Sequence, residues 1–148
     1  KEKLGIKDYD TMELILRLKD KAIEVIRANG DILLGQELIP AAVLRSRNIS
    51  DFSKEVILLK KMNNIKVQVK IMSAGVGHFG VSVWVEDKQG RGAVRDLRVS
   101  LFKMGLEIES YLSDSGEVLF EYVPAGNYII GIFRAGEDPS IVIIEAGL

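Results

Sequence analysis

His78 is the only histidine of the chain, and its imidazole could serve as a general base or as a metal ligand. It stands beside Gly77, where a strand-like segment begins. No aspartate, glutamate or second histidine stands near it at a spacing typical of metal ligands, and the chain has no cysteine. We therefore predict a loop histidine without a catalytic or metal-binding role.

Three other groups of residues have side chains that could do chemistry. Asp114-Ser115-Gly116 offers two side-chain oxygen ligands, whereas calcium takes about six to eight, so a β-turn is the better interpretation. Gly75-Val76-Gly77 is too short for a phosphate-binding loop, and no strand-to-helix pattern adjoins it. An enzyme would need Glu107, Glu109 and Glu121 to converge in space. We predict a protein that is not an enzyme and that binds no cofactor or metal.

Trp84 and Tyr111 are the candidate partner-binding residues. In the alternation of apolar and polar residues, Trp84 shares a face with Ser82 and Glu86, and Tyr111 shares a face with Glu109. These faces are predicted to point to solvent, and exposed aromatic side chains mark contact surfaces. The alternative is that helices from the first third of the chain cover this face.

From residue 65 onward, apolar and polar residues alternate with a period of two, which is typical of half-buried strands. Asp114-Ser115-Gly116 and Pro124-Ala125-Gly126 supply two of the turns between these segments. The predicted strands are residues 65–72, 79–86, 97–103, 106–112, 117–123, 127–133 and 140–145. Seven short strands are the number expected of a small β-sandwich.

The order of strands and turns in this stretch resembles the carboxypeptidase-regulatory-like family, whose domains are transthyretin-like or immunoglobulin-like β-sandwiches. The matching residues are Asp114, Gly116, Val118, Phe120, Val123, Pro124, Gly126 and Tyr128. The resemblance covers roughly residues 65–148 and implies a fold but no particular activity. Tyr128 is similar to a tyrosine corner, in which the hydroxyl group hydrogen-bonds to nearby backbone.

Before residue 64 we find a helical period instead. Asp10 and Glu13 resemble a capping box, and residues 10–29 carry an apolar stripe that ends at Asn29-Gly30, a typical helix C-terminus. The stripe consists of Met12, Ile15, Leu18, Ala22, Val25 and Ile26. Two more helices are predicted, at residues 41–47 and from Ser50 or Asp51 to Met62. The expected fold is therefore α+β, with a helical segment at residues 1–63 and a seven-strand antiparallel β-sandwich at residues 64–148.

Composition and charge restrict the classes of function that we expect for the protein. Twenty basic and 21 acidic side chains leave a formal net charge of -1, which argues against a nucleic-acid partner. No apolar run approaches the roughly 18 residues of a membrane span. We expect a protein-protein interaction or accessory module of a larger bacterial-type assembly, with a homodimer as one arrangement. The alternatives are an anti-sigma-like regulatory protein, whose helix at residues 10–29 engages a partner helix, and a carbohydrate-binding module that uses Trp84 and Tyr111.

Overall fold

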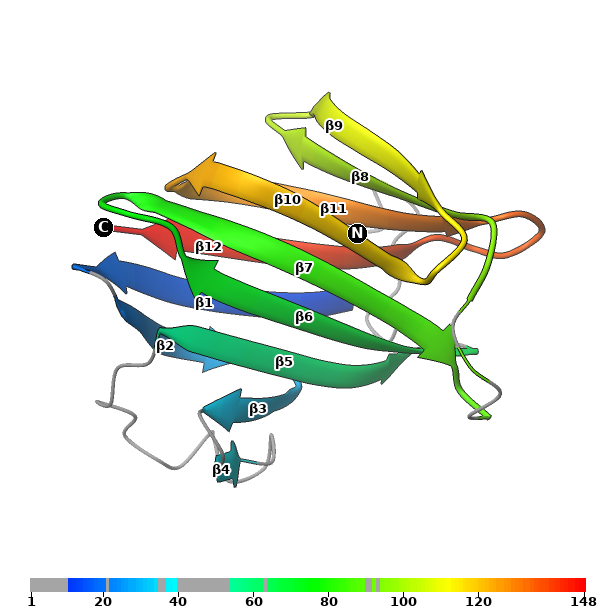
Figure 1. Ribbon diagram of the computed structural model, residues 1–148, viewed down its shortest axis with the longest axis horizontal. Helices are drawn as coiled ribbons and strands as arrows, with labels where there is room; N and C mark the ends of the chain where they lie inside the picture. The colour runs from blue at the N-terminus through cyan, green and yellow to red at the C-terminus, as the bar shows by residue number, and fades with distance from the viewer. Residues whose placement is uncertain are drawn as a thin grey trace.

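The computed structural model describes residues 11–20, 22–34, 37–39, 54–62, 64–89, 92 and 94–148. In this part of the chain every regular element is a β-strand, and the strands form two six-stranded sheets that lie face to face (Figure 1). The first sheet has the order β2-β1-β12-β11-β8-β9, and the second has the order β10-β7-β6-β5-β3-β4. The strands are β1 (Thr11–Lys19), β2 (Ala22–Ala28), β3 (Asp31–Leu34), β4 (Glu37–Ile39), β5 (Glu55–Met62), β6 (Ile65–Ser73), β7 (His78–Asp87), β8 (Leu97–Lys103), β9 (Leu106–Ser113), β10 (Glu117–Pro124), β11 (Gly126–Arg134) and β12 (Ser140–Gly147).

The seven strands predicted after residue 64 are confirmed as β6 to β12, with ends that differ by no more than two residues. Alternation decides which side chains enter the core. In β6, for example, Ile65, Val67, Val69 and Ile71 are buried between the sheets, and the residues between them point outward. The described chain is thus an all-β, two-layer fold compatible with a β-sandwich.

The predicted helix at residues 10–29 is wrong, because these residues form the antiparallel pair β1 and β2. Burial in β1 follows a period of two: Met12, Leu14, Leu16 and Leu18 are buried. Ile15, which the helical stripe placed on the buried side, instead points away from the core. The strand forms because β12 and β2 supply ladder partners on both of its edges.

The predicted helix that ends at Met62 is also wrong where the structure describes it. Residues 55–62 form β5, which pairs with β6 over its whole length and buries Val56, Leu58 and Met62. The helix predicted at residues 41–47 lies outside the described residues, as do residues 50–53. No described segment is a helix that could cross a membrane. The α+β expectation is therefore replaced by an all-β fold.

Residues 11–62 contribute strands to both sheets. β1 and β2 extend the first sheet, and β3, β4 and β5 extend the second. β1 joins β12 in parallel, from Thr11 opposite Ile141 to Arg17 opposite Gly147. The expectation of a purely antiparallel sandwich is therefore wrong for this pair of strands. Parallel pairing needs a long connection, and here the rest of the domain lies between the two strands.

Tyr128 forms the tyrosine corner that the sequence predicts. Its ring is 3% exposed and meets the buried Phe79 edge-on, with ring centroids 6.0 Å apart. Its hydroxyl group donates a hydrogen bond of 2.7 Å to the carbonyl oxygen of Pro124, four residues earlier. Burial raises the pKa of this phenol above 10.0. The corner fixes the turn between β10 and β11 to the core.

We predict that Tyr128→Phe lowers the free energy of unfolding by about 1 kcal/mol, because one hydrogen bond is lost and the packing is kept. The folded state favours the protonated phenol, so this contribution is fully present below pH 10.0 and is lost as the pH rises through the raised pKa. The free energy of unfolding, measured with urea at pH 8 and above pH 10, should therefore fall less between these pH values in the variant than in the wild type. Tyr122→Phe, at an exposed ring, is the control, and an equal effect there would contradict the prediction.

Candidate functional site

An open hollow of about 570 Å³ lies on the outer face of the second sheet, where Trp84 is half-buried. Its floor is a row across three strands, because Leu59 of β5 lies opposite Gln68 of β6, which lies opposite Trp84 of β7. The turn between β2 and β3 forms one side of the hollow. The described residues that line it are Asn29, Gly30, Asp31, Leu59, Lys60, Lys61, Lys66, Val67, Gln68, Trp84 and Glu86. The alternation in β7 correctly predicts that Trp84 faces outward.

Polar groups orient the indole ring in this hollow. The indole Nε1 of Trp84 donates a hydrogen bond of 3.2 Å to Oε2 of Glu86, and Glu86 also pairs with Lys66 at 3.7 Å. The site therefore offers a flat apolar ring beside groups that can donate and accept hydrogen bonds. Such a combination suits a ligand that has both an apolar face and hydroxyl or amide groups.

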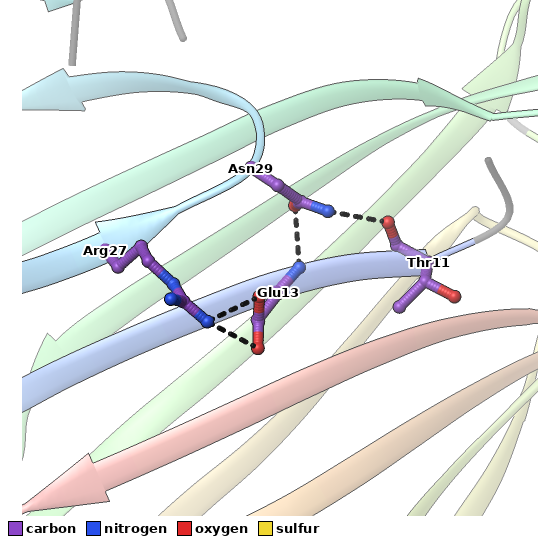
Figure 2. A network of polar contacts seen from close by, with 4 residues as sticks. All are labelled: Thr11, Glu13, Arg27 and Asn29. Carbon is purple, nitrogen blue, oxygen red and sulfur yellow. Dashed lines mark hydrogen bonds and ion pairs between the residues drawn. The ribbon is translucent and has the colours of Figure 1, made fainter. Parts of the chain in front are cut away.

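Asn29 holds the turn at the side of the hollow in place (Figure 2). Its Oδ1 accepts a hydrogen bond of 2.7 Å from the backbone N–H of Glu13, and its Nδ2 donates one of 3.0 Å to the carbonyl oxygen of Thr11. Arg27 donates to both carboxylate oxygens of Glu13 in the same network. Asn29 is thus a bridge from the β2–β3 turn to β1, not the helix end that the sequence predicts.

Gly30 is required for a different reason from the one that the sequence predicts. Its backbone does not have the positive φ of a helix-ending glycine. A Cβ atom at this position would lie 2.7 Å from the carbonyl oxygen of Leu59 and 2.9 Å from Cδ1 of Leu58. The absence of a side chain therefore lets the β2–β3 turn approach β5 closely, which shapes the hollow.

Tyr111 lies away from the hollow, at a different surface. It stands on β9 opposite the buried Val99, so its ring is on the core side of the sheet and not on the solvent side that the alternation predicts. At the edge of the sheet the ring stays 46% exposed and meets Phe120 of β10 with centroids 5.6 Å apart. The hydroxyl group donates a hydrogen bond of 3.0 Å to Oε1 of Glu109. The pKa of Tyr111 is raised chiefly by this bond and by the charge of Glu109, with a smaller contribution from the charge of Glu121. The two predicted binding residues are thus not in one site.

The strands that carry Tyr111 form an apolar edge of the molecule that the sequence analysis did not identify. We call residues 106–124, which include β9, β10 and the turn between them, the β9–β10 edge. Most of the large exposed apolar side chains of the described chain lie in it: Leu106, Ile108, Tyr111, Leu112, Leu119 and Tyr122. β9 and β10 end their respective sheets in the described chain. Finding this edge required the strand order, which local sequence does not give.

His78 stacks on Tyr122, with ring centroids 3.9 Å apart and an interplanar angle of 9°. Tyr122 has a φ of 53° and lies where the pairing of β10 with β7 shifts between Phe120 and Val123. This β-bulge turns the Tyr122 ring toward the imidazole. The described residues contain no group of three or more acidic or histidine side chains that could hold a metal ion.

The three glutamates that an enzyme would need are only partly brought together. Glu109 and Glu121 both act on the phenol of Tyr111 through their charges. Glu107 instead forms an ion pair of 2.7 Å with Arg98. The arrangement gives no paired carboxylates with opposed roles.

No protein-family model, curated protein or solved structure matches the chain.

Proposed function

We propose that this protein is a non-enzymatic protein-interaction module whose binding surface is the β9–β10 edge. The exposure of the edge carries the proposal: Leu112 is 82% exposed, Leu106 is 72% exposed, and Tyr111 is 46% exposed beside them. Neighbouring exposed apolar side chains on a folded domain mark sites of protein interaction. An accessory role in a larger assembly agrees with the predicted resemblance to carboxypeptidase-regulatory-like domains, which implies no activity of its own.

The test is capture of a partner by purified protein with substitutions in the edge. Tyr111→Ala and Leu112→Ser should each weaken capture of a partner by about tenfold, because interface aromatic and apolar anchors carry most of the binding energy. Ile26→Ser is the matched control, since Ile26 is a 49% exposed residue of β2, at the opposite end of the same sheet. Unchanged capture by both edge variants would refute the proposal.

A second candidate function is carbohydrate binding in the hollow that contains Trp84. An indole ring beside Gln68, Lys66 and Glu86 can stack on the apolar face of a sugar while polar groups bind its hydroxyl groups. Tyr111 takes no part in this version, because it lies at the β9–β10 edge.

A glycan array with wild-type protein, Trp84→Ala and Trp84→Phe tests this candidate. We expect binding by the wild type, loss in Trp84→Ala and partial retention in Trp84→Phe, which keeps a flat ring. An array without hits would dispose of the carbohydrate candidate and leave the protein-interaction proposal intact. The anti-sigma-like alternative is not proposed, because the helix at residues 10–29 on which it depended is the strand pair β1 and β2.

A further inference from the structure

β9 is a strand whose second edge has no partner among the residues that the structure describes. It ends the first sheet and pairs only with β8. Natural edge strands are usually protected by lysine, proline or a bulge, since free N–H and C=O groups invite another strand. The pairing with β8 is irregular between Leu101 and Phe102, but the stretch from Glu109 to Ser113 pairs regularly and has no lysine or proline. Its one charged residue, Glu109, lies on the core side and repels an acidic strand but attracts a basic one. This stretch can therefore accept an added strand that brings positive charge to that side.

The β9–β10 edge is also strongly acidic. Residues 106–124 contain no lysine or arginine, and their acidic residues are Glu107, Glu109, Asp114, Glu117 and Glu121. Arg98 of β8 neutralises Glu107 through the 2.7 Å ion pair. The charges of Glu109 and Glu121 meet at Tyr111, where both raise the pKa of the phenol. The edge thus combines apolar side chains with acidic ones, of which Glu109 and Glu121 form no ion pair with any residue that the structure describes.

The two faces of an added strand would meet different chemistry. On the side toward β10, its side chains would lie next to Glu109 and Tyr111, with Glu121 nearby. On the outer side they would lie next to Leu112, which is opposite Arg98, and next to Ser110, which accepts a hydrogen bond from Arg98. Positive charge is therefore favoured toward β10, and apolar character is favoured on the outer side.

We propose that β9 accepts, by strand addition, an extended segment of a partner protein in which basic residues alternate with apolar residues. Main-chain hydrogen bonds to β9 provide the attachment, and the alternation matches the acidic inner side and the apolar outer side. The inference rests on the proposed protein-interaction function and names the partner's chemistry. A second copy of this chain fits less well, because two acidic edges would repel each other.

Synthetic eight-residue peptides with blocked ends test the proposal. The first alternates lysine and valine, the second alternates glutamate and valine, and the third is the lysine–valine peptide with alternate backbone amides methylated. We expect the first to bind at least tenfold more tightly than either of the others. In hydrogen exchange, the first peptide should protect backbone amides within Glu109–Ser113. Equal binding of the lysine and glutamate peptides, or of the methylated peptide, would overturn the proposal, as would no binding at all.

Charge variants locate the site. The double variant Glu109→Gln and Glu121→Gln should weaken binding of the lysine–valine peptide by about threefold to tenfold. The matched control, Asp20→Asn with Glu24→Gln, removes the same charge at the opposite end of the sheet and should leave binding unchanged. Equal losses in the two double variants would overturn the assignment to β9.

The outcome separates this inference from the broader proposal. If Tyr111→Ala and Leu112→Ser abolish partner capture while the lysine–valine peptide does not bind, the interaction surface stands and the proposed partner chemistry falls. If wild-type protein forms a dimer in sedimentation experiments and Leu112→Ser makes it monomeric, the occupant is a second copy and the inference also falls.

Discussion

A chain that begins at Asn64 should fail to fold, although it contains every strand that the sequence correctly predicts. In the complete domain, β12 pairs with β1 and β6 pairs with β5, so the shortened chain loses one neighbour on each sheet. The deleted residues also supply buried side chains to the core between the sheets. These are Met12, Leu14, Leu16, Leu18, Ile23, Val25, Ile32, Val56, Leu58 and Met62.

These side chains also cover the core side chains of the strands that remain, so the shortened chain would expose apolar faces to water. It would also leave β6 and β12 with an unpaired edge each. We therefore expect the shortened chain to lack a cooperative thermal transition and to lack dispersed amide signals in a proton–nitrogen NMR spectrum. The full chain measured under the same conditions is the control. A cooperative transition in the fragment would show that residues 64–148 form an independent domain.

The strands after residue 64 could be predicted because local sequence and tertiary structure agree there. β6, for example, alternates buried and half-buried side chains from Ile65 to Met72. β8 is followed by Met104-Gly105, where both residues have positive φ and form the turn to β9. Tyr128 could be placed for a similar reason, since its partner, Pro124, lies in the adjacent turn. Short-range features of this kind are complete within a few residues of sequence.

The first strands could not be predicted because two periodicities coexist in the same residues. The segment TMELILRLK places apolar residues at every second position, yet Met12, Ile15 and Leu18 also satisfy a helical stripe. What decides between them is β12, which lies more than a hundred residues away in the sequence and pairs with β1. Secondary structure here depends on a long-range partner that local pattern does not reveal.

In the candidate surfaces too, local sequence predicts some features, whereas others depend on contacts between distant parts of the chain. Alternation predicts that Trp84 points outward, and it does, but the hollow around it depends on Gly30 approaching Leu59. The alternation also set Tyr111 on a face with Glu109, and the two side chains do bond, but that face is the core side of the sheet and not the predicted solvent side. That both belong to a terminal strand of a sheet follows from strand order alone.

The second large effect that we expect is a difference in the free energy of unfolding between two neighbouring substitutions in β1. This difference distinguishes a strand from a helix. Leu16 is 2% exposed and points between the sheets, whereas Ile15 points to the outer face. Leu16→Ala should lower the free energy of unfolding by about 2–5 kcal/mol, because it leaves a cavity in the core. Ile15→Ala should cost clearly less, since this side chain is only half-buried.

The two substitutions form a matched pair, because they lie next to each other and remove similar apolar volumes. A helix with the stripe Met12, Ile15 and Leu18 would give the opposite order, with Ile15 the more costly position. Urea unfolding of both variants decides between the two structures. A larger loss for Ile15→Ala than for Leu16→Ala would contradict the strand, and with it the parallel pairing to β12 that joins the start of the described chain to its end.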